Sequence, residues 1–327
     1  MSSQNLLEIK HVKKLFAVPK GMLHAVDDVS FSVKQGETLG IVGESGCGKS
    51  TLGRVILRLH EPTAGKILFK GMDITTFSKE EMRQMRQHMQ IIFQDPYASL
   101  NPRMTVSQII EEPLTFFRIY KSDKERRAKV AELMELIGLS QSASNSYPHE
   151  FDGGRRQRIV IARALAINPS FIVCDEPVSA LDVSIQAQIL NLMVKLQKQL
   201  GLTYMFISHD LSVVKHISDH VGVMYLGQLI EKATKSTFFK RPLHPYSMAL
   251  LSAIPSVNVL EKKNKIILKG EISSPINPQQ GCRFAPRCPF AQGICLEKDP
   301  EWKEVEAEHF VACHRVEELA QGLIHYH

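Results

Sequence analysis

The sequence predicts an α/β fold in which a glycine-rich loop joins a buried strand to a helix. An apolar run over Glu37–Val42 ends in a glycine-rich turn, and this turn leads into a helical pattern over Ser50–Leu59. Two more apolar runs, Phe171–Cys174 and Thr203–Ile207, suit strands that are buried on both faces of a parallel sheet. A helical stretch over Ile185–Gln199 connects these two runs. The order strand, glycine loop, helix is the layout that a phosphate site requires.

The segments around this core are predicted to be antiparallel strands and amphipathic helices. Leu6–Val18 and Ala25–Val33 are apolar and β-branched, which favours strands at the start of the chain. The stretch Lys124–Gly138 places its apolar side chains on one helical face and ends in a glycine, a common helix stop. Val221–Leu226 and Leu229–Ala233 flank a Gly-Gln pair and predict a late hairpin.

A change of composition predicts a domain boundary near residue 245. Prolines become dense beyond Arg241, and the periodicity of helices and strands fades there. We therefore expect a first domain over residues 1–245, with a helical subdomain at about 96–158. Residues 246–327 are expected to form a small, irregular C-terminal extension that carries four cysteines.

The composition excludes several classes of protein. Hydrophobic residues make up 44% and charged residues 23%, values of a globular protein rather than a disordered or collagen-like chain. No apolar run approaches the roughly 18–20 residues of a membrane-spanning helix. The N-terminus lacks the apolar core of a signal peptide, so we expect the chain to stay in the cytoplasm. The net charge of +6 fits a nucleic-acid or membrane-surface partner, and equally a protein with neither.

The glycine-rich turn matches the pattern G-x-x-x-x-G-K-[ST]. Backbone N–H groups of such a loop wrap phosphates, Lys49 reaches the β- and γ-phosphates, and the Ser50 hydroxyl ligates Mg²⁺. A structural glycine turn is the alternative, and the flanking strand and helix favour the nucleotide site. The loop residues predicted to bind nucleotide are Gly43, Glu44, Ser45, Gly46, Cys47, Gly48, Lys49, Ser50 and Thr51.

Two carboxylates at the end of the strand Phe171–Cys174 predict the second half of the site. Asp175 is expected to serve the water shell of Mg²⁺, and Glu176 to polarise the attacking water. A solvated loop is the alternative interpretation of this acidic pair, and the phosphate loop argues against it.

Together these features resemble the nucleotide-binding subunits of ATP-binding-cassette (ABC) transporters. More narrowly, the chain resembles the second ATPase subunit of bacterial oligopeptide and dipeptide permeases over nearly its whole length. The resemblance is carried by IIFQDPYASLNPRMTV with Gln94, the D-loop Ser179–Asp182, FISHD with His209, LHPYSMALLSAIP, and the cysteine-bearing tail. It implies a P-loop NTPase fold, in which a RecA-like core is joined by an antiparallel β part and a helical subdomain.

The resemblance also implies roles for single residues. Glu176 and His209 would be catalytic, and Gln94 would contact Mg²⁺ and couple the site to the helical subdomain. Asp182 would belong to the nucleotide site through the D-loop. Phe16 would stack on adenine, although a core phenylalanine on the first strand is an equally good interpretation. Two ATP molecules would lie between two head-to-tail cassettes, each held by one chain's loop and the other chain's signature.

The function implied is that of an ATPase, a translocase that couples ATP hydrolysis to import of dipeptides or oligopeptides. The cofactors would be ATP and Mg²⁺. The partners would be a second ATPase subunit, two transmembrane permease subunits and an extracytoplasmic peptide-binding protein, with no nucleic acid. The chain would lie peripherally at the cytoplasmic face of the membrane. Alternatives are a nickel-chelate importer, a catalytically weakened regulatory subunit, and an ABC protein of DNA repair or translation.

The signature departs from the family's Leu-Ser-Gly-Gly-Gln. Here Asp152 precedes Gly153 and Gly154, and Arg155 follows them. Because Asp is a good N-cap, the helix need not suffer, but a carboxylate would face the γ-phosphate. We therefore expect two unequal ATP sites. The site formed by this chain's signature and the partner's loop should be the weaker one, and the charge of Arg155 should offset part of the repulsion from Asp152. The alternative is that Asp152 turns away and both sites work.

Four cysteines define the C-terminal extension. A reducing cytoplasm argues against disulfides, and a proline-rich segment with little core gains from a metal staple. Four thiolates can carry a [4Fe–4S] cluster, which the resemblance also implies, with nearby arginines offsetting its charge. Zinc, with His309 or His314, and unligated thiols are the alternatives. The predicted cluster ligands are Cys282, Cys288, Cys295 and Cys313, whereas Cys47 and Cys174 are expected to be packing residues.

Overall fold

The computed structural model describes residues 5–254, 266–268, 270, 273–324 and 326. The chain forms two compact units. Within the described residues, unit 1 comprises 34–37 and 76–207, and unit 2 comprises 5–33, 38–75 and those from 208 onward. Pro255 of the LHPYSMALLSAIP stretch lies outside the described residues.

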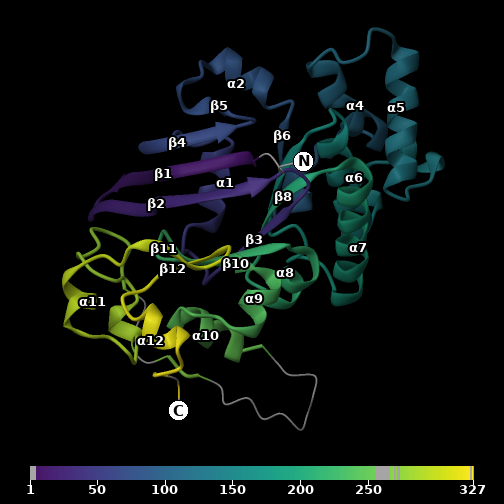
Figure 1. Ribbon diagram of the computed structural model, residues 1–327. Coiled ribbons are helices and arrows are strands. Elements are labelled where there is room, and N and C mark those ends of the chain that lie inside the picture. Colours follow the sequence, from purple (N-terminus) through teal and green to yellow (C-terminus); the bar gives the residue numbers. More distant parts are fainter. Residues whose placement is uncertain (1–4, 255–265, 269, 271–272, 325, 327) are drawn as a thin grey trace. The chain divides into compact units, whose positions relative to one another are not determined.

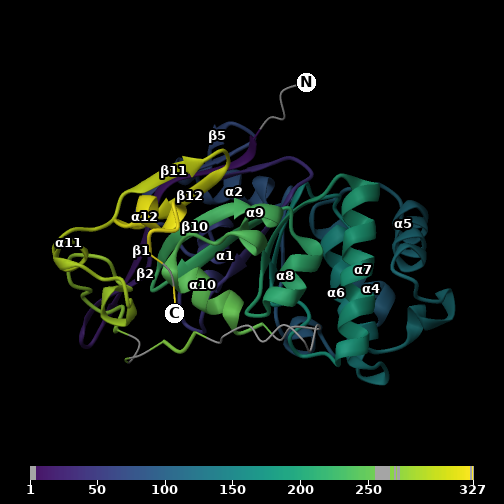
Figure 2. The same cartoon turned by 60° about the horizontal axis from the view of Figure 1, so that its bottom comes forward.

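Unit 1 contains three parallel strands in the order β8–β7–β6. Strands β7 (Phe171–Asp175) and β8 (Thr203–Ile207) are buried at every residue, which confirms the prediction of strands covered on both faces. Strand β6 (Met89–Ile92) is at the end of this order. Helix α7 (Val183–Leu200) connects β7 to β8 and runs beside α6 (Gly153–Leu165), as Figure 2 shows.

The remaining helices of unit 1 begin at polar capping residues. Ser122 and Thr105 accept hydrogen bonds from backbone N–H groups in the first helical turn, and a Glu or Gln side chain bonds back in each case. The predicted helix near residues 124–138 is confirmed, and Gly138 after it adopts a left-handed φ of 72°. These helices are α2 (Lys79–Met85), α3 (Pro96–Ser99), α4 (Val106–Phe116) and α5 (Asp123–Leu136), with 3₁₀ turns at Gln141–Asn145 and Pro148–Glu150.

Unit 2 contains an antiparallel part that begins at the N-terminal strands, as predicted. Its strand order is β2–β1–β4–β5, and β1, β2 and β4 can be followed side by side in Figure 1. Burial alternates over Leu7–Ile9 of β1 and Val29–Val33 of β2, which is the pattern of strands covered on one face. The strands are β1 (Asn5–Val18), β2 (Gly21–Lys34), β4 (Ala64–Phe69) and β5 (Met72–Asp73), followed by a 3₁₀ turn at Ile74–Thr76.

A second group of strands in unit 2 carries the phosphate loop. Strand β3 (Thr38–Val42) is parallel to β9 (His220–Tyr225), and β9 forms the predicted hairpin with β10 (Gln228–Thr234). Helix α1 (Lys49–Ile56) follows β3 and ends three residues before the predicted Leu59, because Arg58 adopts a left-handed φ of 49°. The other helices are α8 (Leu211–Ile217), α9 (Lys235–Lys240) and α10 (Pro245–Ser252).

The C-terminal extension contributes short regular elements to unit 2. Strand β12 (His309–Ala312) pairs antiparallel with β10 and with β11 (Trp302–Glu306), so the extension adds a hairpin to the strands of the cassette. Buried Leu243, Val311 and Val316 form a small core there. The extension also holds a 3₁₀ turn at Ala285–Arg287 and helices α11 (Gly293–Glu297) and α12 (Val316–Ala320). The boundary near residue 245 stays a prediction.

Among the residues that the structure describes, no helix is both long enough and apolar enough to cross a membrane.

Candidate functional site

The loop between β3 and α1 requires glycine at two positions because other backbone segments approach it. Gly43 and Gly48 have φ values of 152° and 103°. A Cβ on Gly43 would lie 2.2 Å from the carbonyl oxygen of Met224, and a Cβ on Gly48 would lie 2.0 Å from that of Ala25. The loop is therefore a closely packed backbone cradle at the point where α1 begins.

Lys49 places a buried cation inside this cradle. Lys49 is only 5% exposed, and its Nζ donates to the carbonyl oxygens of Gly43 and Glu44 at 2.8 and 2.9 Å. The cradle and the ammonium together fit a polyphosphate, because an anion in the loop would meet backbone donors and a positive charge at once. Burial raises the pKa of the neighbouring Cys47 thiol, which agrees with its expected role in packing.

Glu44 in the loop is held by residues from far along the chain. Its N–H donates to the Tyr246 hydroxyl at 3.0 Å. Arg287 Nη1 lies 3.2 and 3.1 Å from the two Glu44 carboxylate oxygens and 3.4 Å from the Tyr225 hydroxyl. Sequence reasoning missed Arg287 and Tyr246 as loop contacts, because 243 and 202 residues separate them from Glu44 and no spacing pattern spans such a gap.

The acidic half of the predicted site lies in unit 1 at the end of β7. Asp175 is the last residue of the strand and is 4% exposed. Glu176 follows with a φ of 50°, and its N–H donates to the Ile207 carbonyl at 3.0 Å. Gln94 Nε2 donates to Glu176 Oε2 at 3.2 Å, so two predicted residues 82 positions apart come together. Glu176 is one of ten described non-glycine residues with a positive φ, and its backbone is held in this conformation by the hydrogen bond to Ile207.

The D-loop follows directly and is tied to the same glutamate. Ser179 Oγ donates to the Glu176 carbonyl oxygen at 3.0 Å. Asp182 is the N-cap residue of α7, although its side chain makes no capping hydrogen bond in the described structure. The D-loop therefore runs from the candidate catalytic residue to the start of α7.

The signature residues begin helix α6 as expected. Asp152 Oδ1 accepts the Arg155 N–H at 2.8 Å, and Asp152 Oδ2 lies 3.5 Å from Arg155 Nε. The two side chains are 61% and 62% exposed, so the pair faces solvent. A Cβ on Gly154 would lie 2.5 Å from Ile185 Cγ2, which explains why this position keeps a glycine.

His209 and Phe16 both belong to unit 2. The N–H of Ser208 donates to the Ile41 carbonyl at 3.1 Å, and the exposed His209 directly follows Ser208. Asp210 caps α8 by accepting the Ser212 N–H at 2.7 Å. Phe16 is half-buried on β1, with its ring edge-on to His60 at a centroid distance of 5.6 Å.

Comparison with known proteins identifies this arrangement. Residues 26–179 match the ABC transporter family model, and residues 230–295 match the model of the oligopeptide/dipeptide transporter C-terminal region. The oligopeptide transport ATP-binding protein AppF of Bacillus subtilis (strain 168) is 55% identical over 323 residues, which cover 96% of this chain and 98% of AppF. The chain belongs to the ABC transporter ATP-binding proteins.

Further relatives agree with this ABC assignment. The oligopeptide transport ATP-binding protein OppF of the same Bacillus strain is 50% identical over 316 residues, covering 96% of this chain and 98% of OppF. Among solved structures, a dimeric post-hydrolysis state of the ATP-binding cassette MJ0796 bound to ADP and Pi is 30% identical with a TM-score of 0.64. That match covers 70% of this chain and 98% of MJ0796. The fold is therefore that of an ABC ATPase cassette.

The predicted iron–sulfur cluster of this ABC protein is wrong. No group of three or more His, Cys, Asp or Glu side chains within the described residues is placed to hold a metal ion. Cys282, Cys288, Cys295 and Cys313 do line one cavity, but its volume is about 20 Å³, room for roughly one water molecule. Burial raises the pKa of Cys282 to about 11 and that of Cys313 to about 12.

The groups expected to support a metal in this ABC protein have other partners. His309 Nε2 pairs with Glu231 at 2.8 Å, and His314 Nε2 bonds the Lys298 carbonyl at 2.9 Å, so neither supports the zinc alternative. The arginines expected to offset cluster charge instead form ion pairs: Arg283 with Asp27, Arg287 with Glu44, and Arg315 with Glu318. The four cysteines are free thiols, and Cys313 packs against the small core of the extension.

Proposed function

We propose that this ABC ATPase drives the import of dipeptides or oligopeptides across the cell membrane. The observation that carries the proposal is the match to AppF at 55% identity over 98% of its length, together with the C-terminal region typical of such transporters. The chain also retains a complete phosphate loop and the contact of Gln94 with Glu176. No described feature favours the nickel-chelate, regulatory, or DNA-repair and translation alternatives over this function.

Each set of site residues has its own proposed role in ATP hydrolysis. Bound ATP·Mg²⁺ supplies the phosphoryl group and the divalent charge that polarises it. The loop N–H groups and Lys49 would hold the phosphates, and Phe16 would lie against the adenine. The proposed contacts to Mg²⁺ and its waters come from Ser50, Gln94 and Asp175. The nucleotide contacts are completed by Asp182 of the D-loop and by Asp152, Gly153 and Gly154 of the signature.

Glu176 is the proposed general base and His209 the proposed second catalytic group. Hydrogen bonding to Gln94 keeps the Glu176 carboxylate at the strand end, where it would accept a proton from the attacking water. His209 would contact the phosphoryl group. It lies in the turn directly before α8, the helix that Asp210 caps.

The proposed partners follow from the transporter family. A second ATPase subunit would meet this chain head to tail, and the dimeric state of the similar cassette MJ0796 supports a pair of cassettes. Two permease subunits would hold the chain peripherally at the cytoplasmic face of the membrane, and an extracytoplasmic peptide-binding protein would deliver the substrate. Phosphate binding and proximity to the membrane account for the net charge of +6, so no nucleic acid is needed.

The test is transport by the assembled complex in proteoliposomes with labelled peptides. We expect peptide uptake coupled to ATP hydrolysis, and a loss of both by about 100-fold or more in Glu176→Gln with ATP binding retained. Glu135→Gln, an exposed residue on α5, is the matched control and should leave both rates unchanged. Hydrolysis retained in Glu176→Gln would contradict the assigned base, and hydrolysis without peptide uptake would contradict the assigned substrate.

A further inference from the structure

The turn between β9 and β10 packs against the phosphate loop. Gly227 in this turn donates its N–H to the carbonyl oxygen of Cys47 in the loop at 2.8 Å, and its own carbonyl oxygen accepts the N–H of Asp27 on β2 at 2.8 Å. A Cβ on Gly227 would lie 2.4 Å from the carbonyl oxygen of His24, so the turn fits closely beside β2. The conformation of the turn is therefore linked to that of the phosphate loop.

This turn places a leucine where the backbone is left-handed. Tyr225 and Gln228 pair across the hairpin, so Leu226 and Gly227 form a two-residue turn. Their φ values are 44° and 84°, and a turn with two left-handed residues favours Asn-Gly or Gly-Gly. In this region the Cβ of a leucine lies too close to the following carbonyl oxygen, and such strain persists only where surrounding contacts hold it. Burial of the Leu226 side chain, which is 5% exposed, supplies part of that hold.

Arg283 of the C-terminal extension supplies a second hold on the turn. Its side chain is 7% exposed. Its Nη1 donates to the carbonyl oxygen of Leu226, and its Nη2 donates to the carboxylate of Asp27. Because hydrogen bonds from a charged donor are stronger than those between neutral groups, one planar guanidinium fastens the left-handed leucine to β2.

Asp27 is a well-supported anchor for this guanidinium. The residue is 7% exposed, and its carboxylate oxygens lie 2.7 Å from His24 Nδ1 and 3.3 Å from Lys13 Nζ. Burial alone would raise the pKa of Asp27, whereas the hydrogen bond with His24 and the charge of Arg283 lower it below its usual value. Since His24 and Lys13 also face this carboxylate, removal of Arg283 would not leave a buried charge without a partner.

We propose that Arg283 is a positioning residue for ATP binding. It holds the Leu226–Gly227 turn in its left-handed conformation, and that turn holds the phosphate loop through Cys47. The C-terminal extension thereby sets how tightly the loop binds ATP. This path differs from that of Arg287, which contacts the loop directly through the Glu44 side chain. The inference rests on the proposed ATP hydrolysis and does not depend on which substrate is transported.

The first test is Arg283→Met, which keeps an unbranched apolar side chain and loses both hydrogen bonds. We expect the Kd for ATP of the full-length chain to rise about tenfold in a nucleotide titration, because the loop loses part of its preorganisation. In the assembled complex, the KM for ATP should rise by a similar factor while kcat changes by less than about twofold. This split is expected because Arg283 acts on the loop and touches no reacting group.

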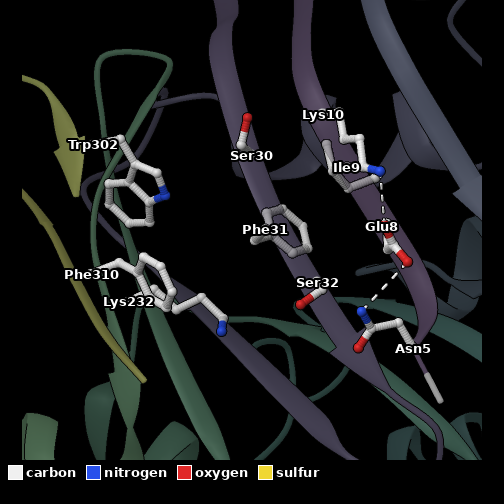
Figure 3. A pocket seen from close by; sticks show the side chains of 10 residues that line it. All are labelled: Asn5, Glu8, Ile9, Lys10, Ser30, Phe31, Ser32, Lys232, Trp302 and Phe310. Carbon is white, nitrogen blue, oxygen red and sulfur yellow. Dashed lines mark hydrogen bonds and ion pairs between the residues drawn. The ribbon is translucent and has the colours of Figure 1, made fainter. Parts of the chain in front are cut away.

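The matched control is Arg315→Met on the same extension. Arg315 likewise pairs with a carboxylate, that of Glu318, and donates to a backbone carbonyl oxygen, that of Phe290 at 3.2 Å. Its loss should leave the Kd for ATP unchanged. Trp302, the single tryptophan of the chain, stacks with Phe310 on the β11–β12 hairpin (Figure 3), so its emission and unfolding curves verify that the extension of each variant is folded.

A change at Leu226 separates positioning from a general loss of packing. Glycine adopts a positive φ without strain, so a Leu226→Gly turn needs less help from Arg283 to keep its shape. Leu226→Gly also removes a buried side chain, so the effect of Arg283→Met is measured relative to Leu226→Gly alone. We expect Arg283→Met to raise the Kd for ATP about tenfold in the wild-type background and less than about threefold in the Leu226→Gly background.

Two results would overturn the proposal. One is an unchanged Kd and KM for ATP in folded Arg283→Met, and the other is an equal rise of the Kd in both backgrounds. Should Arg283→Met not fold, Arg283→Lys makes the same comparison with a smaller expected rise of about threefold, because an ammonium lacks the planar fork that meets both acceptors. A wild-type chain that binds no ATP would instead contradict the proposed function, and this inference with it.

Discussion

At the residue scale, Asp152 is the position where this chain departs most clearly from its family's signature. A carboxylate at about 4 Å from a phosphate charge costs on the order of 4 kcal/mol at an effective dielectric near 20. Solvent exposure and the Arg155 guanidinium, 3.5 Å away, reduce that cost. We expect Asp152→Ser to lower the KM for ATP of the assembled heterodimer by about tenfold at the affected site, as steady-state hydrolysis would measure.

The Asp152–Arg155 pair also provides a control for the predicted change of KM. Arg155→Ala removes the offsetting charge and should raise that KM, whereas the double variant should resemble Asp152→Ser alone because the two charges are coupled. A second measurement compares Glu176→Gln with the equivalent change in the partner. Equal losses of turnover from these two changes would show that the sites are equivalent and that Asp152 turns away.

Residues that act through a local pattern could be predicted from the sequence, whereas long-range partners could not. The loop glycines and Lys49 follow one another in a pattern whose geometry is local, and the structure places them in one cradle. Arg287 is 243 residues from Glu44, and only folding brings them together. The cysteines were misinterpreted for the same reason: residue type identifies possible ligands, but burial and competing ion pairs decide whether they form a site.

At the element scale, the 3₁₀ turn Ala285–Arg287 contacts the phosphate loop through one guanidinium. Arg287→Met would leave the part-buried Glu44 carboxylate without that partner and loosen the loop. We expect a rise of several-fold in the Kd for ATP and a drop of a few degrees in the unfolding temperature, by nucleotide titration and calorimetry.

The matched control lies on the same extension. Arg315→Met removes a guanidinium that pairs with Glu318, away from the loop, and should leave the Kd for ATP unchanged. Arg287→Lys should recover part of the affinity, because an ammonium can still meet the carboxylate but lacks the fixed planar geometry with which the guanidinium contacts both Glu44 and Tyr225. An Arg287→Met protein with wild-type nucleotide affinity would contradict the role of this contact.

Helix α10 begins at a buried histidine that makes unit 2 sensitive to acid. His244 accepts the Tyr246 N–H at 3.1 Å, and burial lowers its pKa from 6.5 to about 4. Because the unfolded chain binds this proton more tightly, stability is lost as pH falls below about 6.5, by about 3 kcal/mol when pH 4 is reached. Denaturant unfolding between pH 7.5 and 4.5 measures the loss.

The control for this acid sensitivity is His244→Asn. An amide oxygen can accept the same N–H without titrating, so the variant should show a flatter dependence of the free energy of unfolding on pH. An equally steep dependence in the variant would assign the acid sensitivity to other groups.

At the scale of the whole molecule, the order of elements was predictable because strands and helices alternate with clear periodicity. Strands β7 and β8 are continuous apolar runs, and β9 and β10 flank a glycine turn, so their types and bounds follow from local sequence. The β11–β12 hairpin was not predicted, because its residues alternate weakly and its stability comes from pairing with β10. Long-range pairing of this kind leaves little trace in composition.

The division of the nucleotide residues among loop, acidic strand end and signature predicts that one chain cannot complete a site. If each signature serves the partner's phosphate loop, the isolated chain should bind ATP through Lys49 and its cradle yet hydrolyse it about 100-fold more slowly than the heterodimer, or worse. Adding the purified second subunit should restore turnover, with a rate that rises faster than linearly with protein concentration at low concentration.

The Lys49→Ala chain tests the same point in complex, because it loses ATP at its own loop while its signature still serves the partner. We expect residual turnover in that complex, and a complete loss there would show that hydrolysis at the two sites is strictly coupled.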